Sequence, residues 1–376
     1  MLKSRSQSQI DFSIERSSKL NPKLPKISII VPMFNAENVI ETCIESILYQ
    51  SFRDFELIIV DDKSTDASYG LVQEKYCTPS AKNFDARIKL FQHIKNSGES
   101  ASRNFGLDLA RGDYIFFMDD DDAILEKTLE TFYVEAKKSD ADIVAMNSHF
   151  NSLDPNFSFP GEINIVKRIC NRSQPRFLSN NILDRLQDEF VDYGIFVMIW
   201  TKLYRRKLLI DHEIRFPDIS RNGGFLFNFA TLCLSKKFQV IDACGYIYRM
   251  GNLGSMMQVS AERHLHATME SLSKSVAYME EIFSKKIISP ISRANQVICE
   301  AFMLKELLHG LVVNCAYCGD NELPLSKIDL ILREMSREST MHDPEVMRVM
   351  THTLALVMNY FFNLSLERDR VFELER

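Results

Sequence analysis

The 376-residue sequence lacks the features that mark several functional classes. It has 45 basic and 51 acidic residues and a net charge of −6, so it has no basic excess of the kind that general nucleic-acid binders carry. Its eight cysteines are scattered, without the spacing of a disulfide framework. The N-terminus has no apolar stretch resembling a secretory signal. These absences predict a reduced, cytoplasmic protein that does not bind nucleic acid.

Two standard phosphate-binding motifs are also missing. No G-x-x-x-x-G-K-[ST] is present, and no G-x-G-x-x-G follows the first apolar run, which argues against a P-loop enzyme and a dinucleotide dehydrogenase. No clean transmembrane segment appears. The best candidate, residues 349–366, is marginal in length and contains polar residues, so we interpret it as a packed or interfacial helix. Peripheral association with the inner face of a membrane therefore stays open.

The residues that are present divide the chain into four parts. Residues 1–25 read as a flexible arm, and residues 1–26 carry a net charge of +4, which could also attract an anionic membrane surface. Residues 26–150 alternate apolar runs with helical patterns. Residues 151–256 begin with polar, punctuated sequence and then return to order, and residues 257–376 are predicted to be helical.

Residues 26–150 predict an α/β fold. Short β-branched runs alternate with amphipathic segments, and such repeats indicate a Rossmann-like, mostly parallel sheet with helices on both faces. The strands are expected at residues 27–33, 55–60, 87–94, 114–118 and 141–150. The helices are expected at residues 36–51, 99–112 (closed by Gly112) and 124–139.

Polar residues follow three of these strands, in "VPMFN", "VDDKSTD" and "MDDDD". Ligands of open parallel sheets bind at the carboxyl ends of the strands, so the three segments should converge. Asp119 and Asp121, two apart at a strand end, can point to the same side. Their carboxylates suit Mg²⁺ or Mn²⁺, with substrate phosphates completing the metal's shell. The alternative is helix capping, in which Asp122 serves as an N-cap before "AILE".

With these three motifs in this order, residues 26–150 resemble glycosyltransferase family 2, which has the GT-A fold. The resemblance implies a nucleotide-sugar donor, most often a UDP-sugar, and a Mn²⁺ or Mg²⁺ cofactor. It implies that the base and ribose are bound by Pro32, Phe34, Asn35, Glu37, Asp61, Asp62 and Asp120. It further implies that Arg103 lies near the base or diphosphate, and that Asp119 and Asp121 bind the metal.

Several of these residues have plainer interpretations. Phe34 could belong to the core, and Arg103 could form a surface ion pair. Asp66 reads as an N-cap before "ASYG". In the second half, "IWTKLYRRKLL" and "YIYRMGNLGSMM" also resemble family segments. The resemblance places Trp200, Lys202, Arg249 and Ser255 near the acceptor or diphosphate, although the single tryptophan could be plain packing.

The chain departs from the family at the catalytic base. An inverting sugar transfer needs a base to deprotonate the acceptor hydroxyl. The family's Glu-Asp pair falls on Gly223 and Gly224 in "FPDISRNGGFLFNF". Asp218 is the nearest upstream acid, and Asp192 is another choice.

These observations lead us to expect an inverting, metal-dependent glycosyltransferase. It would move a sugar from a nucleotide diphosphate sugar, with UDP favoured, to a glycan or lipid-linked acceptor in surface polysaccharide or glycolipid synthesis. One alternative is a catalytically weak or inactive binding or scaffold protein on the same fold. A nucleotidyltransferase is a further alternative, because it shares a similar sheet and acidic metal site.

Overall fold

The computed structural model describes residues 24–152, 175–182, 184–185, 198–219, 223–250, 274–275 and 277–287. Most of the basic arm, Asp192, Ser255 and residues 349–366 lie outside these ranges. So does most of the predicted helical C-terminal region, although residues 277–284 are helical as expected. Within the described ranges, no helix is long and apolar enough to cross a membrane.

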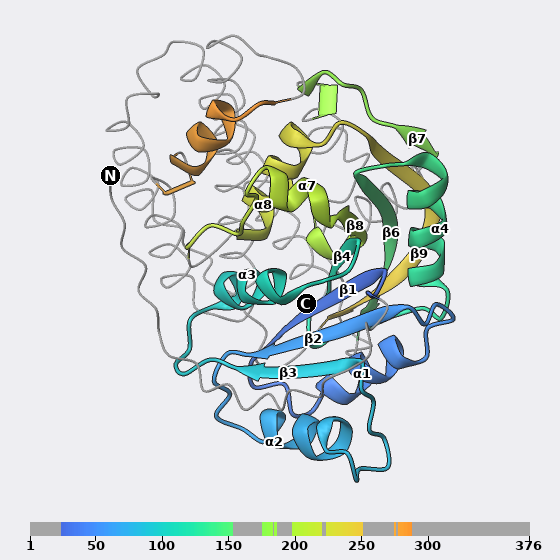
Figure 1. Cartoon of the computed structure of the whole chain (residues 1–376), viewed down its shortest axis with the longest axis vertical. Coiled ribbons are helices and arrows are strands. Elements are labelled where there is room, and N and C mark those ends of the chain that lie inside the picture. The colour runs from blue at the N-terminus through green and yellow to red at the C-terminus, as the bar shows by residue number, and fades with distance from the viewer. Residues whose placement is uncertain are drawn as a thin grey trace, which may run out of the picture.

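One mixed sheet organises the described residues (Figure 1). Its strands run in the order β3-β2-β1-β4-β8-β6-β9-β5, with β7 also paired to β9. The strands predicted from sequence are β1 (Ile27–Met33), β2 (Phe55–Asp61), β3 (Ile88–Gln92), β4 (Tyr114–Phe117) and β6 (Ile143–Ser152), of which the first four pair in parallel. The others are β5 (Ala123–Ile124), β7 (Arg176–Phe177), β8 (Lys202–Arg205) and β9 (Phe238–Met250).

The second half of the sheet departs from a simple parallel order. Strand β8 lies between β4 and β6 and is antiparallel to both, whereas β9 is parallel to β6. The helices are α1 (Ile40–Leu48), α2 (Ser68–Val72), α3 (Glu99–Leu109), α4 (Thr128–Ser139), α7 (Arg206–Asp211) and α8 (Gly223–Leu234). Two short turns of other helix types are η1 (Gln73–Cys77) and η2 (Ile199–Thr201).

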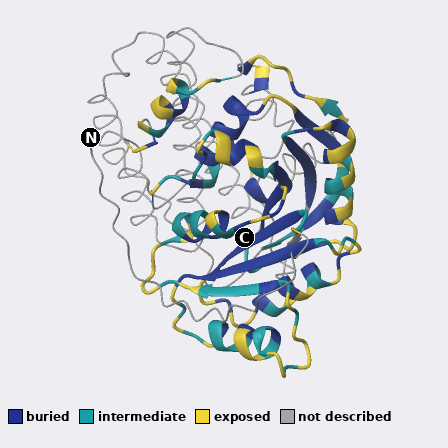
Figure 2. Ribbon diagram, in the orientation of Figure 1, coloured by how far each residue is buried: buried dark blue, intermediate teal, exposed yellow. Residues whose placement is uncertain are grey.

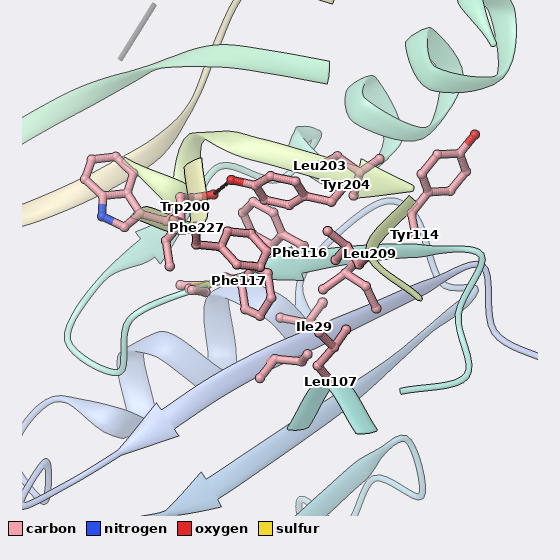
Figure 3. Packing of buried hydrophobic residues seen from close by; sticks show 14 of the residues in the cluster. Ile29, Leu107, Tyr114, Phe116, Phe117, Trp200, Leu203, Tyr204, Leu209 and Phe227 are labelled. Carbon is pink, nitrogen blue, oxygen red and sulfur yellow. Dashed lines mark hydrogen bonds between the residues drawn. The ribbon is translucent and has the colours of Figure 1, made fainter. Parts of the chain in front are cut away.

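Helices cover both faces of the sheet because neighbouring side chains of a strand point to opposite sides. On β4, the ring of Phe116 packs against Phe132 of α4 at 5.6 Å between centroids, and Phe117 packs against Phe227 of α8 at 5.4 Å. Ile30 of β1 is the register partner of Phe117 and contacts Gly106 of α3. Helices α3 and α8 therefore share one face, and α4 covers the other (Figures 1 and 3).

The central strands are the most deeply buried part of the sheet (Figure 2). Every residue of β1 and β2 is buried, as their continuous apolar runs predict for strands covered on both faces. Strand β3 is only partly buried and lies at the end of the strand order. Strands β2, β1 and β4 thus form the buried centre of the sheet. The three polar segments follow their carboxyl ends.

Several predicted helix ends are wrong, and α1 is shorter at both ends than the predicted 36–51. The helix expected to begin at Ile124 begins at Thr128, because residues 123–124 pair with β9 as strand β5. Asp122 therefore precedes a strand and is not a helix N-cap. Gly112 does not close the preceding helix either, since α3 ends at Leu109 and its C-cap is Ala110 in an extended conformation. A Cβ at Gly112 would lie 2.5 Å from the amide nitrogen of Ser28, so glycine there permits a close backbone approach.

Candidate active site

The three polar segments meet at the carboxyl edge of the sheet, as their strand positions predict. The amide of Asp62, after β2, donates to the carbonyl of Met33 in β1 at 2.8 Å. The amide of Phe34 donates to Oδ2 of Asp120, after β4, at 3.0 Å. Residues separated by up to 86 positions in the chain are thereby joined at one edge.

The loops after β1 and β2 are tied together by several further hydrogen bonds. Oδ1 of Asn35 accepts from the amide of Thr65 at 2.8 Å, and the amide of Asn35 donates to Oγ of Ser64 at 2.9 Å. Oε2 of Glu37 accepts from the amide of Ala67 at 2.9 Å. Asn35 and Glu37 therefore tie the loop after β1 to the loop after β2, whereas Pro32 lies buried within β1.

The two acids after β2 also support loops. Oδ1 of Asp61 accepts from Oγ of Ser64 at 2.5 Å, and its Oδ2 accepts from Nε2 of Gln92 at 2.8 Å. The carboxylate of Asp62 accepts from the amides of Ser97 and Gly98 at 2.7 Å each, and only 4% of the residue is exposed. Asp62 thus fixes the entry to α3, a role that its assignment to base binding did not anticipate.

Asp66 is not the N-cap of α2, as predicted, because the N-cap is Ala67. Asp66 precedes it, and its Oδ1 accepts from the amide of Ser68, the first residue of the helix, at 3.0 Å. Its Oδ2 also accepts from the amide of Glu37 at 3.2 Å. Asp66 therefore links the start of α2 to the loop after β1.

Phe34 is not a core residue, because 46% of it is exposed at this edge. An exposed aromatic face beside the loop after β2 offers a surface on which a nucleobase could stack. The next residue, Asn35, has a φ of 53°, and Lys63 in the facing loop has a φ of 63°. A left-handed lysine is uncommon, and such conformations cluster at functional sites.

The four aspartates form a turn beyond the strand. Strand β4 ends at Phe117, and the amide of Asp122 donates to the carbonyl of Asp119 at 3.4 Å. The strand-alternation argument for Asp119 and Asp121 was therefore wrong, since the backbone is already turning. We call residues 119–122 the acidic loop.

Arg103 of α3 is the cation beside this loop. It is 5% exposed, and one of its terminal nitrogens, Nη2, contacts both Glu99 and Oδ1 of Asp119, the latter at 2.6 Å. The guanidinium also lies 5.4 Å from the centre of the Phe216 ring. The surface ion-pair interpretation is wrong, because this arginine is buried against the acidic loop.

The carboxylates of the acidic loop repel one another. Burial, followed by the charge of Asp121, raises the pKa of Asp120 well above its usual range. Burial, with Asp119 and Asp121 next in importance, raises the pKa of Asp122 to about 9. A bound cation would relieve this repulsion.

The donor atoms of the acidic loop fit a hard divalent metal. Asp119 uses Oδ1 for Arg103, and its Oδ2 has no hydrogen-bond partner among the described residues. Within the same ranges, no group of three or more His, Cys, Asp or Glu side chains is arranged to hold a metal. Mg²⁺ is usually held by only one or two carboxylates together with substrate phosphates, so a metal at this loop would need the donor to complete its shell.

Tyr246 of β9 is a residue of this site that the sequence did not single out. It is fully buried, and its hydroxyl donates to Oδ2 of Asp122 at 2.6 Å and accepts from the amide of Asp119 at 3.2 Å. The sequence drew attention to its segment, "YIYRM", but only for Arg249. The amide of Arg249 donates to Oδ1 of Asp122 at 2.8 Å.

Gly223 and Gly224, which occupy the position of the family's Glu-Asp pair, lie at the start of α8. Gly223 packs against α3. A Cβ at Gly223 would be 2.5 Å from Oγ of Ser100 and 3.9 Å from the carbonyl oxygen of Pro217. A Cβ at Gly224 would make only an ordinary contact, 3.5 Å from Ile199. Gly223 thus permits a close approach between the two helices, whereas Gly224 has room for a side chain.

Asp218 lies beside this position, in the segment that precedes α8. It follows Pro217 directly and is exposed. Phe216 is fixed to α3 by two hydrogen bonds with Asn104, of 2.8 and 2.9 Å. Its ring stacks on Phe227 of α8 at 4.1 Å. The chain around Asp218 is therefore anchored to the same two helices that flank the missing pair.

The chain is similar to known glycosyltransferases in sequence and fold. A profile described as "Glycosyl transferase family 2" matches residues 28–211. Glycosyltransferase GlyA of Streptococcus pneumoniae is 32% identical over 68% of this chain, but the chain spans only 34% of that protein. The GalNAc(5)-diNAcBac-PP-undecaprenol beta-1,3-glucosyltransferase of Campylobacter jejuni is 30% identical, over 69% of this chain and 84% of its own length.

A solved structure has a similar fold. The crystal structure of S. aureus TarS residues 1–349 in complex with UDP-GlcNAc has a TM-score of 0.61 and 20% identity. The match covers 92% of each chain. This similarity confirms the GT-A class of fold, and together with the matches in sequence it leads to one conclusion. The chain belongs to glycosyltransferase family 2.

Proposed function

We propose that this protein transfers a sugar from a nucleotide diphosphate sugar, with UDP-sugars favoured, to a glycan or lipid-linked acceptor. The observation that carries the proposal is the buried Arg103 against the acidic loop, at the edge where three strand ends converge. The name of the Campylobacter relative describes a lipid-linked acceptor, and TarS was solved with UDP-GlcNAc. The first supports a role in surface polysaccharide or glycolipid synthesis, and the second supports a UDP-sugar donor.

The donor would occupy the carboxyl edge. The exposed ring of Phe34 would stack on the base, within the loops that Asn35, Glu37 and Asp62 hold in place. The ribose would lie near Asp120. Arg103 would bind the diphosphate, since its guanidinium already lies between two carboxylates at this edge.

The acidic loop would hold the metal through Asp119 and Asp121. Mn²⁺ or Mg²⁺ bound there would supply positive charge to the diphosphate leaving group. The two residues have different surroundings before any ligand binds, because Asp119 is already paired with Arg103. Asp119 would therefore also orient the arginine toward the diphosphate.

The acceptor hydroxyl would be deprotonated by Asp218. Its segment is anchored to α3 through Asn104 and lies beside Gly223, near the position of the family's base pair. An exposed carboxylate is a competent base for an acceptor that arrives from solvent. Attack opposite the diphosphate would invert the anomeric centre. Acceptors on lipid carriers would bring the protein to the inner face of a membrane.

One observation favours a second candidate function. Neither Gly223 nor Gly224 carries a carboxylate, and Ser100 occupies the space beside Gly223. A chain that kept the donor site but lost the base would bind nucleotide sugars without transferring them, and would act as a scaffold. The acidic loop would then be retained for binding alone.

Incubation with UDP-sugars tests both functions. The proposed transferase releases UDP from at least one UDP-sugar in Mn²⁺, faster than its Asp121→Asn variant, and releases no pyrophosphate. Release of pyrophosphate from UTP and a sugar 1-phosphate, with no UDP released from UDP-sugars, would indicate a nucleotidyltransferase instead. Binding of UDP-sugars without release of UDP, in the presence of undecaprenyl-linked and glycan acceptors, would favour the scaffold.

A further inference from the structure

Tyr246 joins the acidic loop to the second half of the sheet. Its hydroxyl lies between two atoms of that loop, donating to Oδ2 of Asp122 at 2.6 Å and accepting from the amide of Asp119 at 3.2 Å. Asp119 and Asp122 are the first and last residues of the loop. One buried hydroxyl therefore closes the turn that carries the proposed metal ligands.

The ring of Tyr246 has little freedom to move. It stacks on the indole of Trp200 with centroids 4.2 Å apart and planes 16° apart, and it contacts the edge of Phe116 at 6.4 Å. Tyr248 stacks on Trp200 as well, at 5.3 Å. A rigid ring fixes the hydroxyl, because rotation about the side-chain bonds would break the stacking.

The backbone around Tyr246 holds the same loop. The amide of Arg249 donates to Oδ1 of Asp122 at 2.8 Å, and the carbonyl of Gly245 accepts from the amide of Leu125 at 2.8 Å. Strand β9 also pairs with β5, with Ile124 opposite Tyr246. Irregular register between β6 and β9 at Asn147–Ser148 occurs next to this point, so the strand is not in its ordinary pleat where Tyr246 turns to the loop.

We propose that Tyr246 is a positioning residue for donor and metal binding, and that Asp122 serves as its anchor rather than as a ligand. Asp122 is fully buried, and both of its oxygens accept hydrogen bonds from β9. The hydroxyl of Tyr246 sets the backbone of Asp119, and through the turn it sets the direction of Asp119 and Asp121. The part of this proposal that concerns ligands rests on the proposed function.

The sequence offers a spectroscopic readout of this arrangement. Trp200 is the single tryptophan of the chain, and it stacks directly on Tyr246. Binding at the acidic loop should therefore change tryptophan fluorescence in the wild-type protein. Removing the hydroxyl should weaken that response, although the tryptophan and the ring beneath it remain.

The test compares Tyr246→Phe with Tyr204→Phe. Tyr204 is also fully buried, and its hydroxyl donates to the carbonyl of Ile199 and to Oδ1 of Asn228, away from the acidic loop. The Tyr204→Phe substitution removes these hydrogen bonds. Titration with Mg²⁺ and UDP, followed by calorimetry and by Trp200 fluorescence, should show about 10-fold weaker binding for Tyr246→Phe, the lower range seen when groups supporting metal ligands are removed. Tyr204→Phe should bind as the wild type does. Equal affinity in the two variants would overturn the proposal.

A second measurement separates this proposal from the proposed function. Hydrogen exchange of the Asp119 amide should be at least several-fold faster in Tyr246→Phe than in Tyr204→Phe, whether or not a nucleotide binds. Unchanged exchange would show that the hydroxyl does not hold the loop. If exchange is faster but the wild type binds no nucleotide, the positioning of the loop stands and the donor site is the part that is wrong.

Discussion

Buried carboxylates lie at both ends of the central strands, and the protein neutralises them differently. At the amino end, Glu56 of β2 accepts hydrogen bonds from Oγ of Ser28 at 2.6 Å, from the amide of Arg111 at 2.8 Å, and from Nζ of Lys89. Burial alone would raise its pKa, but these bonds outweigh burial and lower it. At the carboxyl end, burial and neighbouring charges raise the pKa of Asp120 and Asp122.

We infer that the difference separates structural acids from acids that bind the donor and its metal. The protein itself supplies the positive charge and the donors that Glu56 requires. In the acidic loop it brings four carboxylates together, and the buried Arg103 contacts one of them, Asp119. Donor binding with a divalent metal would lower the repulsion that raises the pKa of Asp120 and Asp122.

The largest expected effect is on the proposed catalytic base, Asp218, which belongs neither to the acidic loop nor to the surroundings of Glu56. Asp218→Asn should lower turnover by about 100- to 10,000-fold, because a positioned general base contributes that much. Affinity for UDP should not change, since Asp218 is proposed to act on the acceptor and not on the donor. Release of UDP under saturating donor and acceptor, with calorimetry of UDP binding, measures both. A full rate in Asp218→Asn would remove Asp218 from the mechanism.

A rescue experiment sharpens this prediction. In the Asp218→Asn background, Gly224→Asp should restore part of the rate, because its Cβ would lie at an ordinary 3.5 Å from Ile199. Gly223→Asp is the matched control, since its Cβ would lie 2.5 Å from Oγ of Ser100 and must displace that side chain. Rescue by the Gly223 variant and not by the Gly224 variant would contradict this view of α8.

Removing one acid from the acidic loop should reduce catalysis without destabilising the fold. Asp121→Asn should lower turnover by about 100-fold or more, the size of effect expected when charge stabilisation of a transition state is lost. Its melting temperature without ligands should be equal or higher, because one of several mutually repelling charges is gone. Unchanged turnover, or a clear loss of stability, would place Asp121 among the structural acids.

Removing Glu56, the acid at the amino end, should lower stability without affecting donor binding. Glu56→Gln should cost about 1.5–3 kcal/mol of unfolding free energy, the usual contribution of a hydrogen bond to a charged group. UDP affinity should stay the same. Urea unfolding measures the loss, and Asp113→Asn is the control, because its ion pair with Lys26 is exposed and worth at most about 1 kcal/mol. Equal losses in the two variants would mean that burial of Glu56 adds nothing.

The smallest expected effect is on how the unfolding free energy falls at acidic pH. The folded-state pKa of Glu56 is below its ordinary value of 4.5, so its contribution is complete above that pH and is lost as the pH falls through the lower folded value. Glu56→Gln should flatten the fall in unfolding free energy below pH 4.5, by at most about 1.4 kcal/mol per pH unit for one proton. If the unfolding free energy fell with the same slope below pH 4.5 in the wild type and in Glu56→Gln, the pKa of Glu56 would not be lowered in the folded state.

The donor-side strands were predictable from sequence for a simple reason. The runs at β1, β2 and β4 are apolar on both faces, and only central strands of a covered sheet need that pattern. Polar residues directly after such strands must converge, so Asp62, Asp120 and Phe34 could be placed at one edge before the structure was known.

The support of the acidic loop could not be predicted in the same way. Tyr246 acts on Asp119 and Asp122 across 127 and 124 positions of sequence. Its own strand, β9, pairs with three others in two directions, and no local pattern encodes such pairing. The prediction that Gly112 closes a helix was wrong for a related reason, since its close approach to Ser28 cannot be inferred from the sequence around it.

The most direct test of the central claim is thermal stabilisation by UDP, GDP and CMP, each with Mn²⁺ and with a chelator. A nucleotide at 100 times its dissociation constant should add about 2.7 kcal/mol of stability. We predict that UDP stabilises the wild type in Mn²⁺, stabilises it less with chelator, and leaves Asp121→Asn nearly unchanged. If no nucleotide stabilises the protein with or without metal, the acidic loop is not a donor site and the account is contradicted.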